Sequence, residues 1–255
     1  MKVSTQGNKK LEALLEEING DAELQQLWEM ANNNAVRRLG MSDHGPVHIQ
    51  IVANACVKIL RLLVAAEVQP SAVSEHGLTN DDAEVIVVLA ASLHDVGMAV
   101  HRDNHENYSL MLGYPKSRQH LAKLYDEPNL TTIVSEVLHA IIAHRWDVKP
   151  LSLEAGVLKV ADALDMTQGR SRIPFESGKV NIHSVSAQAV EEVKIKKGED
   201  LPVRVDILLN NSAGIFQVDE LLKRKLANST LSPYVEVVAH LETEEERKIL
   251  EIHKF

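Results

Sequence analysis

The stretch ASLHDVGMAV, residues 91–100, places His94 and Asp95 side by side at the end of a long apolar run. The preceding residues, DDAEVIVVLA over 81–90, predict a helix whose broad apolar face is mostly buried. A carboxylate in such surroundings must be paired, hydrogen-bonded or bound to a metal ion. The stretch therefore predicts a core helix, capped by Asn80 or Asp81 and stopped at Gly97, that presents two polar side chains at its end.

Apolar periodicity predicts that residues 1–176 are almost wholly helical. Asp21 is a plausible N-cap, Gly40 a plausible helix stop, and Pro46 suits the first turn of the helix that follows it. After residue 176 the pattern changes to alternating, β-branched segments around one short helix. The predicted strands are VNIHSVS, VEEVKIKKG, PVRVDILLN, YVEVVAHL and RKILEIHKF. We therefore expect a mainly α protein with a helical domain over 1–176 and a small α+β domain over 177–255.

Composition limits the function classes. The 255 residues are 45% hydrophobic and 25% charged, with a net charge of −9, which argues against general nucleic-acid or membrane-surface binding. A single cysteine, Cys56, falls in an apolar helical stretch and predicts a buried thiol in a reducing compartment. With no signal peptide and no apolar run of membrane-spanning length, we expect a cytoplasmic protein.

The twelve histidines are the unusual feature of the composition. His44 and His48 are four residues apart, which predicts that they share one face of the helix opened by Pro46, and His101 and His105 are again four residues apart. A lone histidine on an apolar face is usually a hydrogen-bonded core residue, and His120 is expected at the surface.

Two carboxylates add to this set. Asp162 and Asp165 are three apart on the otherwise apolar segment VLKVADALD, so they too need partners. Histidines and aspartates on separate core helices satisfy one another only if they converge, and a divalent cation is the usual meeting point. Imidazole and carboxylate without thiolate favour Mn, Fe, Co, Ni, Zn or Mg over a structural zinc site. A His-Glu-x-x-His motif, a glycine-rich phosphate loop and a Gly-x-Ser-x-Gly elbow are all absent from the sequence.

The ordered set His48, then His94-Asp95-Val96-Gly97, then Asp162 in VLKVADALD resembles the HD-domain superfamily of metal-dependent phosphohydrolases. The resemblance covers about residues 30–172. It implies that His48, His94, Asp95 and Asp162 ligate a divalent metal ion, with His94 and Asp95 central to catalysis. His105 and His144 resemble the histidines that hold a second ion in binuclear members, and His144 fits that pattern better than His139.

Other polar residues lie near these segments in sequence. Histidine ligands usually donate their second ring N–H to an acceptor. Candidates for such supporting contacts are Asp43, His44, His101, Asp103 and Asp165. Candidates for binding a substrate phosphate are Arg102, Arg145, Arg170 and Arg172. Surface arginines are an equally good interpretation of these four.

Three functions fit this site. The first is hydrolysis of a phosphate mono- or diester, with a nucleotide or another small phosphorylated molecule as substrate, through a water activated by one or two metal ions. The second keeps the ligands but oxidises a small substrate with dioxygen at a di-iron pair. The third is a regulatory module that binds a nucleotide or metal without turnover. The complete ligand set argues against the third.

The C-terminal residues carry two further expectations. Exposed strand edges there are compatible with a homodimer. The basic run Lys223-Arg224-Lys225 could contact an anion, but Asp219 and Glu220 lie four residues before Lys223 and Arg224, which favours surface ion pairs on a solvated helix face.

Overall fold

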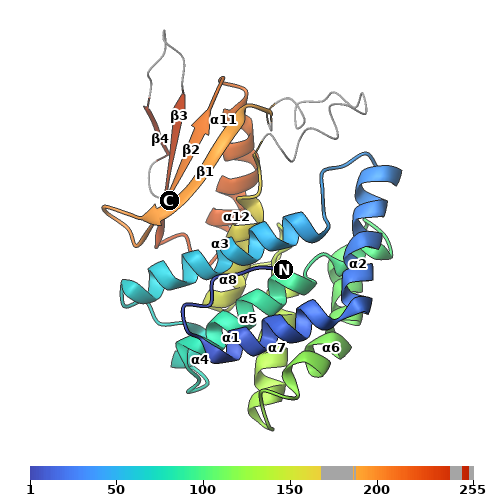
Figure 1. The fold of residues 1–255 in the computed structure, drawn as a ribbon. Helices are drawn as coiled ribbons and strands as arrows, with labels where there is room; N and C mark the ends of the chain where they lie inside the picture. Colours follow the sequence, from blue (N-terminus) through green and yellow to red (C-terminus); the bar gives the residue numbers. More distant parts are fainter. Residues whose placement is uncertain (168–185, 187, 242–248, 253–255) are drawn as a thin grey trace.

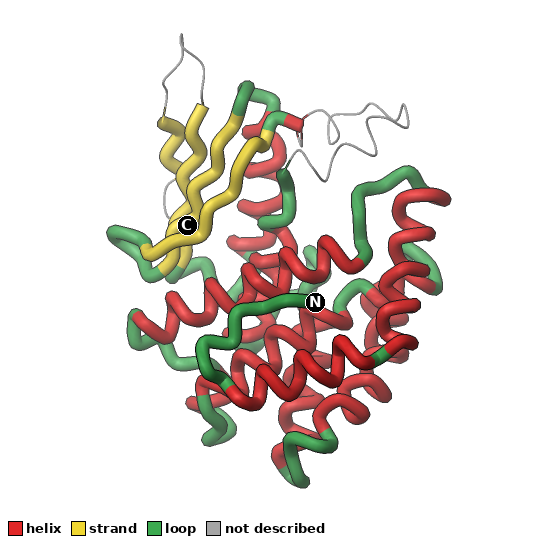
Figure 2. Tube along the Cα trace, viewed as in Figure 1, coloured by secondary structure: helices red, strands yellow, loops and turns green. Residues whose placement is uncertain are grey.

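The computed structural model describes residues 1–167, 186 and 188–241, together with the backbone of 249–252 (Figure 1). Arg170, Arg172 and nearly all of the predicted strand VNIHSVS lie outside the described residues. Helices come first along the chain and a small sheet with its own helix follows, which confirms the predicted mainly α architecture (Figure 2). One continuous apolar core contains residues of both parts, so the division at residue 176 stays a prediction.

The helical part is built around one central helix. α5 (Asn80–Leu93) is buried from Ala83 to Leu93 apart from Glu84, and it contacts α1, α3, α7 and α8. A helix that is apolar on nearly all sides must be surrounded in this way. The surrounding helices are α1 (Lys9–Gly20), α2 (Ala22–Asn32), α3 (Pro46–Ala65), α4 (Ser71–Ser74), α6 (His105–Leu121), α7 (Asn129–Ala143) and α8 (Leu153–Ala163).

Two predicted helix starts are confirmed. The Asp21 carboxylate accepts from the backbone N–H of Leu24 at the start of α2, and Pro46 is the first residue of α3. The predicted cap of α5 was wrong by one residue. Thr79 caps that helix and forms a reciprocal capping box with Asp82, so Asn80 is already inside it.

Gly97 does not end α5, which stops earlier, at Leu93. It lies in a short 3₁₀ turn, η2 (Val96–Ala99). A Cβ atom at this position would lie 2.0 Å from the carbonyl oxygen of His105 and 2.5 Å from the backbone nitrogen of Ser109. Glycine is needed here because the first turn of α6 packs directly on the turn that follows Asp95.

The sheet has the order β1-β2-β3-β4, formed by β1 (Val190–Lys197), β2 (Val203–Leu209), β3 (Val235–Leu241) and β4 (Ile249–Ile252). β1 and β4 are its edges and pair antiparallel with their neighbours, whereas β2 and β3 are parallel. Parallel neighbours need a crossover connection. Here it is one helical stretch, α11 (Gly214–Gln217), η3 (Val218–Lys223) and α12 (Arg224–Ala227). The predicted homodimer is not tested by these edges and stays a prediction.

The crossover helix links the sheet to the helical part. Its buried side chains Val218, Leu222 and Leu226 join the same apolar core as the inward residues of β2. η3 and α12 also contact α8, and α3 contacts β1 and β2. In Figure 1 the crossover helix lies against one face of the sheet and descends toward α8. The C-terminal part thereby reaches the helix that carries Asp162.

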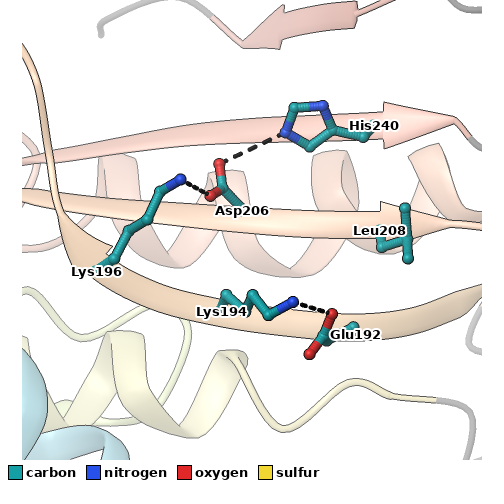
Figure 3. Close-up of a pocket in the computed structure, with 6 residues that line it drawn as sticks. All are labelled: Glu192, Lys194, Lys196, Asp206, Leu208 and His240. Atoms are coloured by element: carbon teal, nitrogen blue, oxygen red, sulfur yellow. Dashed lines mark ion pairs between the residues drawn. The ribbon is translucent and has the colours of Figure 1, made fainter.

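A cavity of about 310 Å³ lies on the sheet, lined by residues of β1, β2 and β3 (Figure 3). Its lysines and carboxylates pair with one another: Lys194 with Glu192, and Lys196 with Asp206, which also lies 3.5 Å from His240. Lysine charges that are already matched by carboxylates leave no clear affinity for an anion, so this cavity does not compete with the buried histidines as a functional site.

The expectation that no apolar run reaches membrane-spanning length was wrong, because α3, alone among the described helices, is long and apolar enough to cross a membrane. Half of the apolar window is buried inside the molecule, against the neighbouring core helices. The helix also carries His48 in its first turn. Burial of this kind is what a core helix of a globular domain requires.

Candidate metal centre

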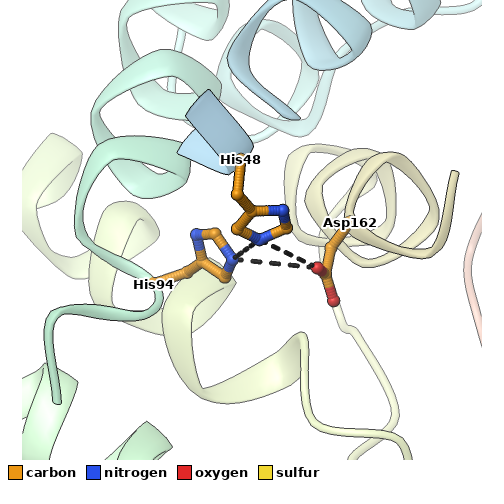
Figure 4. A group of neighbouring side chains, drawn as sticks. All are labelled: His48, His94 and Asp162. Carbon is orange, nitrogen blue, oxygen red and sulfur yellow. Dashed lines mark hydrogen bonds and ion pairs between the residues drawn. The ribbon is translucent and has the colours of Figure 1, made fainter. Parts of the chain in front are cut away.

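His48, His94 and Asp162 converge from three helices (Figure 4). His48 lies in the first turn of α3, His94 directly follows α5, and Asp162 lies in the last turn of α8. The two histidine Nε2 atoms are 3.2 Å apart, and Asp162 Oδ1 lies 3.5 Å from His48 Nε2 and 3.8 Å from that of His94. Three donor atoms that face one point in a buried site are the arrangement that a cation can bind.

Asp95, His105 and His144 form a second group of the same kind. His105 opens α6 and His144 follows α7. Their Nε2 atoms lie 3.3 Å and 3.8 Å from Asp95 Oδ1, and all three residues are buried. Each group therefore offers two imidazole nitrogens and one carboxylate oxygen.

Asp95 joins the two groups. Its Oδ1 faces His105 and His144, whereas its Oδ2 lies 3.4 Å from Nε2 of both His48 and His94. One carboxylate thus has one oxygen directed toward each group. This is the geometry of a bridging ligand between two neighbouring cations.

Contacts at the other ring nitrogen orient the histidines. Nδ1 of His94 lies 2.8 Å from the carbonyl oxygen of Ala91, and Nδ1 of His144 lies 2.5 Å from that of Ile141. A carbonyl can only accept, so Nδ1 carries a proton in both rings. These two histidines therefore direct Nε2 toward the centre, the nitrogen that can bind a metal ion when the ring is neutral.

Burial and charge set the titration of the centre. Burial opposes ionisation of both Asp95 and Asp162, but neighbouring cationic groups, His94 for Asp95 and Lys225 for Asp162, hold the pKa of each well below its usual range. Burial, with His94 nearby, lowers the pKa of His144 to about 3. Ionised carboxylates and a neutral imidazole are the forms that bind metal ions.

The predicted supporting residues differ in whether they contact the ring of a candidate ligand histidine. Asp165 contacts a ring: its Oδ2 lies 2.6 Å from Nδ1 of His48, and both residues are buried. Asp43 instead accepts from the backbone N–H groups of Gly45 and His48 at the start of α3. The prediction that His44 shares a helix face with His48 was wrong, because His44 precedes α3. Its ring lies 5.6 Å from that of His48, and its Nδ1 lies 2.8 Å from the Ser42 carbonyl oxygen.

His101 and Asp103 are not brought to the centre. Both are exposed, and Nδ1 of His101 accepts from the backbone N–H of Asp103 within their own turn. His139 accepts from the backbone N–H of Leu151, away from His144. The surface prediction for His120 was wrong, because its ring is fully buried, 3.2 Å from Asp21. α6 turns polar residues such as Lys116 and Ser117 inward, and apolar periodicity does not detect such a face.

The predicted phosphate-binding arginines differ in their contacts. Arg102 Nη1 lies 2.8 Å from Nδ1 of His105, at the edge of the second group. Arg145 is held in a two-bond ion pair with Asp147, at 2.6 Å and 2.7 Å.

Two lysines near the metal centre were not predicted from the sequence: Lys159 was not singled out, and Lys225 was placed on the surface. Lys159 is buried in α8 and donates to the carbonyl oxygens of Arg145, Trp146 and Val148, which fixes the turn after His144. A lone lysine within the apolar segment VLKVAD was a signal for such a role. Lys225 was expected on a solvated face, but it forms an ion pair with Asp162.

The spacing of the crossover helix would have located Lys225. Val218, Leu222 and Lys225 follow an i, i+4, i+7 pattern, so Lys225 shares the buried face. Lys223 and Arg224 do form the predicted surface pairs with Asp219 and Glu220.

A family model for the HD domain matches residues 52–167 of the chain. The chain is also 41% identical over 241 residues to the uncharacterized protein MJ1020 of Methanocaldococcus jannaschii, an alignment that covers 94% of this chain and 92% of the relative. This protein belongs to the HD-domain superfamily. No solved structure matches the chain significantly. The family match begins four residues after His48, so the place of that histidine in the centre rests on the geometry.

The six converging residues, His48, His94, Asp95, His105, His144 and Asp162, are called the HD centre below. HD domains bind divalent metal ions, and the donor set here fits one. The donors are buried imidazole nitrogens and carboxylate oxygens. Carbonyl groups accept from the Nδ1 atoms of His94 and His144. The chain's one thiol, Cys56, is buried in α3, and burial raises its pKa. Such nitrogen and oxygen donors suit several first-row divalent ions.

Proposed function

We propose that this HD-domain protein is a metal-dependent phosphohydrolase that cleaves a phosphate mono- or diester, with a nucleotide as the expected class of substrate. The observation that supports this most strongly is the position of Asp95, which has one oxygen toward each three-residue group. When bound, divalent ions would supply a water of lowered pKa and positive charge beside the phosphorus.

The residues of the chain would divide the remaining work. His48, His94 and Asp162 would hold one ion, and His105 and His144 a second, with Asp95 shared between them. Asp165 and the carbonyl oxygens of Ala91 and Ile141 keep the rings in their binding orientation. A preorganised, buried site of this kind stabilises charge that develops at the reacting phosphate without further rearrangement.

Contacts with the substrate are also part of the proposal. Arg102 lies beside His105, and Arg145 follows His144, so both are close to the second group. With Arg170 and Arg172 they are the arginines that we propose for the phosphate. The substrate is expected to be a small molecule rather than nucleic acid at large, and the protein is expected to be cytoplasmic.

A di-iron oxygenase is the second candidate, because a bridging carboxylate between two histidine-containing groups serves an iron pair equally well. Metal content separates the two. The test is metal analysis of the purified protein, followed by assays of phosphate and nucleoside monophosphate release from a nucleotide panel with Mn²⁺ added. We expect release by wild-type protein and none by Asp95→Ala.

Other results would refute this assignment. Normal turnover by Asp95→Ala would show that the reaction occurs elsewhere. Two irons per chain with oxygen consumption and no phosphate release would favour the oxygenase. A thermal shift with nucleotides but no turnover across the panel would favour a regulatory module.

A further inference from the structure

Lys225 is the point at which the C-terminal part reaches the HD centre. It lies in α12, in the crossover between β2 and β3, and its ammonium forms an ion pair with Asp162, 63 residues earlier in the chain. The side chains are 18% and 14% exposed. A partly buried pair of this kind is less screened by salt than one on the surface.

The two oxygens of Asp162 have different neighbours. Oδ1 faces Nε2 of His48 and His94, whereas Oδ2 contacts the ammonium of Lys225. The oxygen that belongs to the proposed metal site is therefore not the one that contacts the lysine. A metal ion could therefore bind Oδ1 while Lys225 keeps its ion pair with Oδ2. The ammonium lies next to the HD centre in either case.

The crossover helix holds the lysine in this position. The neighbouring side chains Leu222 and Leu226 are buried in the apolar core, and α12 contacts α8. The adjacent Lys223 and Arg224 pair instead with carboxylates one turn earlier.

We propose that Lys225 is a phosphate-binding residue of the HD centre, contributed by the C-terminal α+β part; this inference rests on the proposed function. An ammonium has three N–H donors, and among the described residues its ion-pair partner is Asp162 alone. The partly exposed side chain leaves donors for the oxygens of a bound phosphate. The group would add positive charge at Oδ2 of Asp162, next to the oxygen that faces His48 and His94.

A merely structural lysine is the competing interpretation, in which Lys225 only fixes Asp162. The structural and the phosphate-binding interpretations differ in which binding affinity depends on the lysine. A structural lysine supports metal binding, so its loss weakens metal affinity and fold stability together. A phosphate-binding lysine contributes to anion affinity, and its loss removes a positive charge that repels a metal ion at Asp162.

The test uses full-length Lys225→Met, with Arg224→Met as the matched control on the same helix. Calorimetry measures the affinity for Mn²⁺ and, on the Mn²⁺-loaded protein, the affinity for inorganic phosphate. We expect Lys225→Met to bind phosphate about tenfold or more weakly, the loss of one charge-assisted hydrogen bond, with Mn²⁺ affinity unchanged or increased. Lys225→Arg should retain most of the phosphate affinity, and Arg224→Met should match wild type.

Unchanged phosphate affinity in Lys225→Met would overturn the inference. So would a parallel loss of Mn²⁺ affinity and melting temperature that Lys225→Arg does not restore, because that pattern identifies a structural role. Failure of the proposed function looks different. If wild type hydrolyses no phosphate ester but Lys225→Met still loses phosphate binding, the reaction is refuted while the anion-binding role of Lys225 is supported.

Discussion

Asp165 Oδ2 lies 2.6 Å from Nδ1 of His48, a buried contact that ties the first turn of α3 to the residues just after α8. A carboxylate that accepts from one ring nitrogen of a ligating histidine fixes the ring and makes the other nitrogen a stronger metal ligand. We expect Asp165→Asn to lower the affinity for Mn²⁺ by about 10- to 100-fold. Calorimetry on the dialysed protein measures this change.

Asp103→Asn is the control for that experiment, since Asp103 was also a candidate supporting residue but lies exposed beside His101. It should leave Mn²⁺ affinity as in wild type. Equal affinities for wild type and Asp165→Asn would show that the contact to His48 has no part in metal binding.

The two groups of the HD centre predict different metal contents for the variants His144→Ala and Asp95→Ala. His144→Ala should remove one ion and leave the other, because His48, His94 and Asp162 remain. Asp95→Ala should lose both, because its oxygens face both groups. Metal content per chain, measured by mass spectrometry after desalting, gives the result. The same content in both variants would contradict the bridging role of Asp95.

A side chain at residue 97 should disturb the second group, Asp95, His105 and His144, through a steric clash. A Cβ at residue 97 would lie 2.0 Å from the His105 carbonyl oxygen, so the start of α6 must shift. We expect Gly97→Ala to lower the free energy of unfolding by about 1–3 kcal/mol and to weaken binding of the second ion. Gly20→Ala, where a Cβ meets nothing within 4 Å, is the control in denaturant titrations. Equal midpoints for the two variants would contradict the close packing.

Asp82 predicts how stability depends on pH. Although burial opposes it, hydrogen bonds from Lys10, Thr79 and Tyr125 lower the pKa of Asp82 from 3.8. A lowered folded pKa means that the unfolded chain binds more protons. The stabilisation is therefore fully present above pH 3.8 and is lost as the pH falls through the folded pKa.

Asp82→Asn should then cost about 1–3 kcal/mol at pH 7 and flatten the loss of stability below pH 4. Urea titrations between pH 3 and pH 7 measure this, with the exposed neighbour Asp81→Asn as control. A parallel pH profile for Asp82→Asn and wild type would show that this carboxylate does not contribute to acid lability.

Much of the fold follows from local pattern. The apolar run over 81–93 predicts a core helix because nearly every position must be buried, and alternation over 203–209 predicts a strand with one buried face. Part of the HD centre follows in the same way. A buried histidine or aspartate needs a partner, so the positions of His48, His94, Asp95 and Asp162 on apolar segments indicated convergence, whereas His105 and His144 were implied by the family resemblance.

Other features depend on tertiary contacts that a linear pattern does not contain. Gly97 looks like a helix stop in sequence, but its role is set by the carbonyl of His105 packed against it. His101 and Asp103 have the right composition for supporting residues, yet their turn faces solvent. His120 is buried on a helix whose inward face is polar, so hydrophobicity gave no signal.

The parallel pairing of β2 and β3 also affects the order in which the protein is completed. The crossover that this pairing requires delivers Lys225 after all six residues of the HD centre have been synthesised. Protein chains generally fold from the N-terminus during translation. During translation Asp162 is therefore made before the lysine that pairs with it, and its ion pair can form only after the crossover helix has been synthesised.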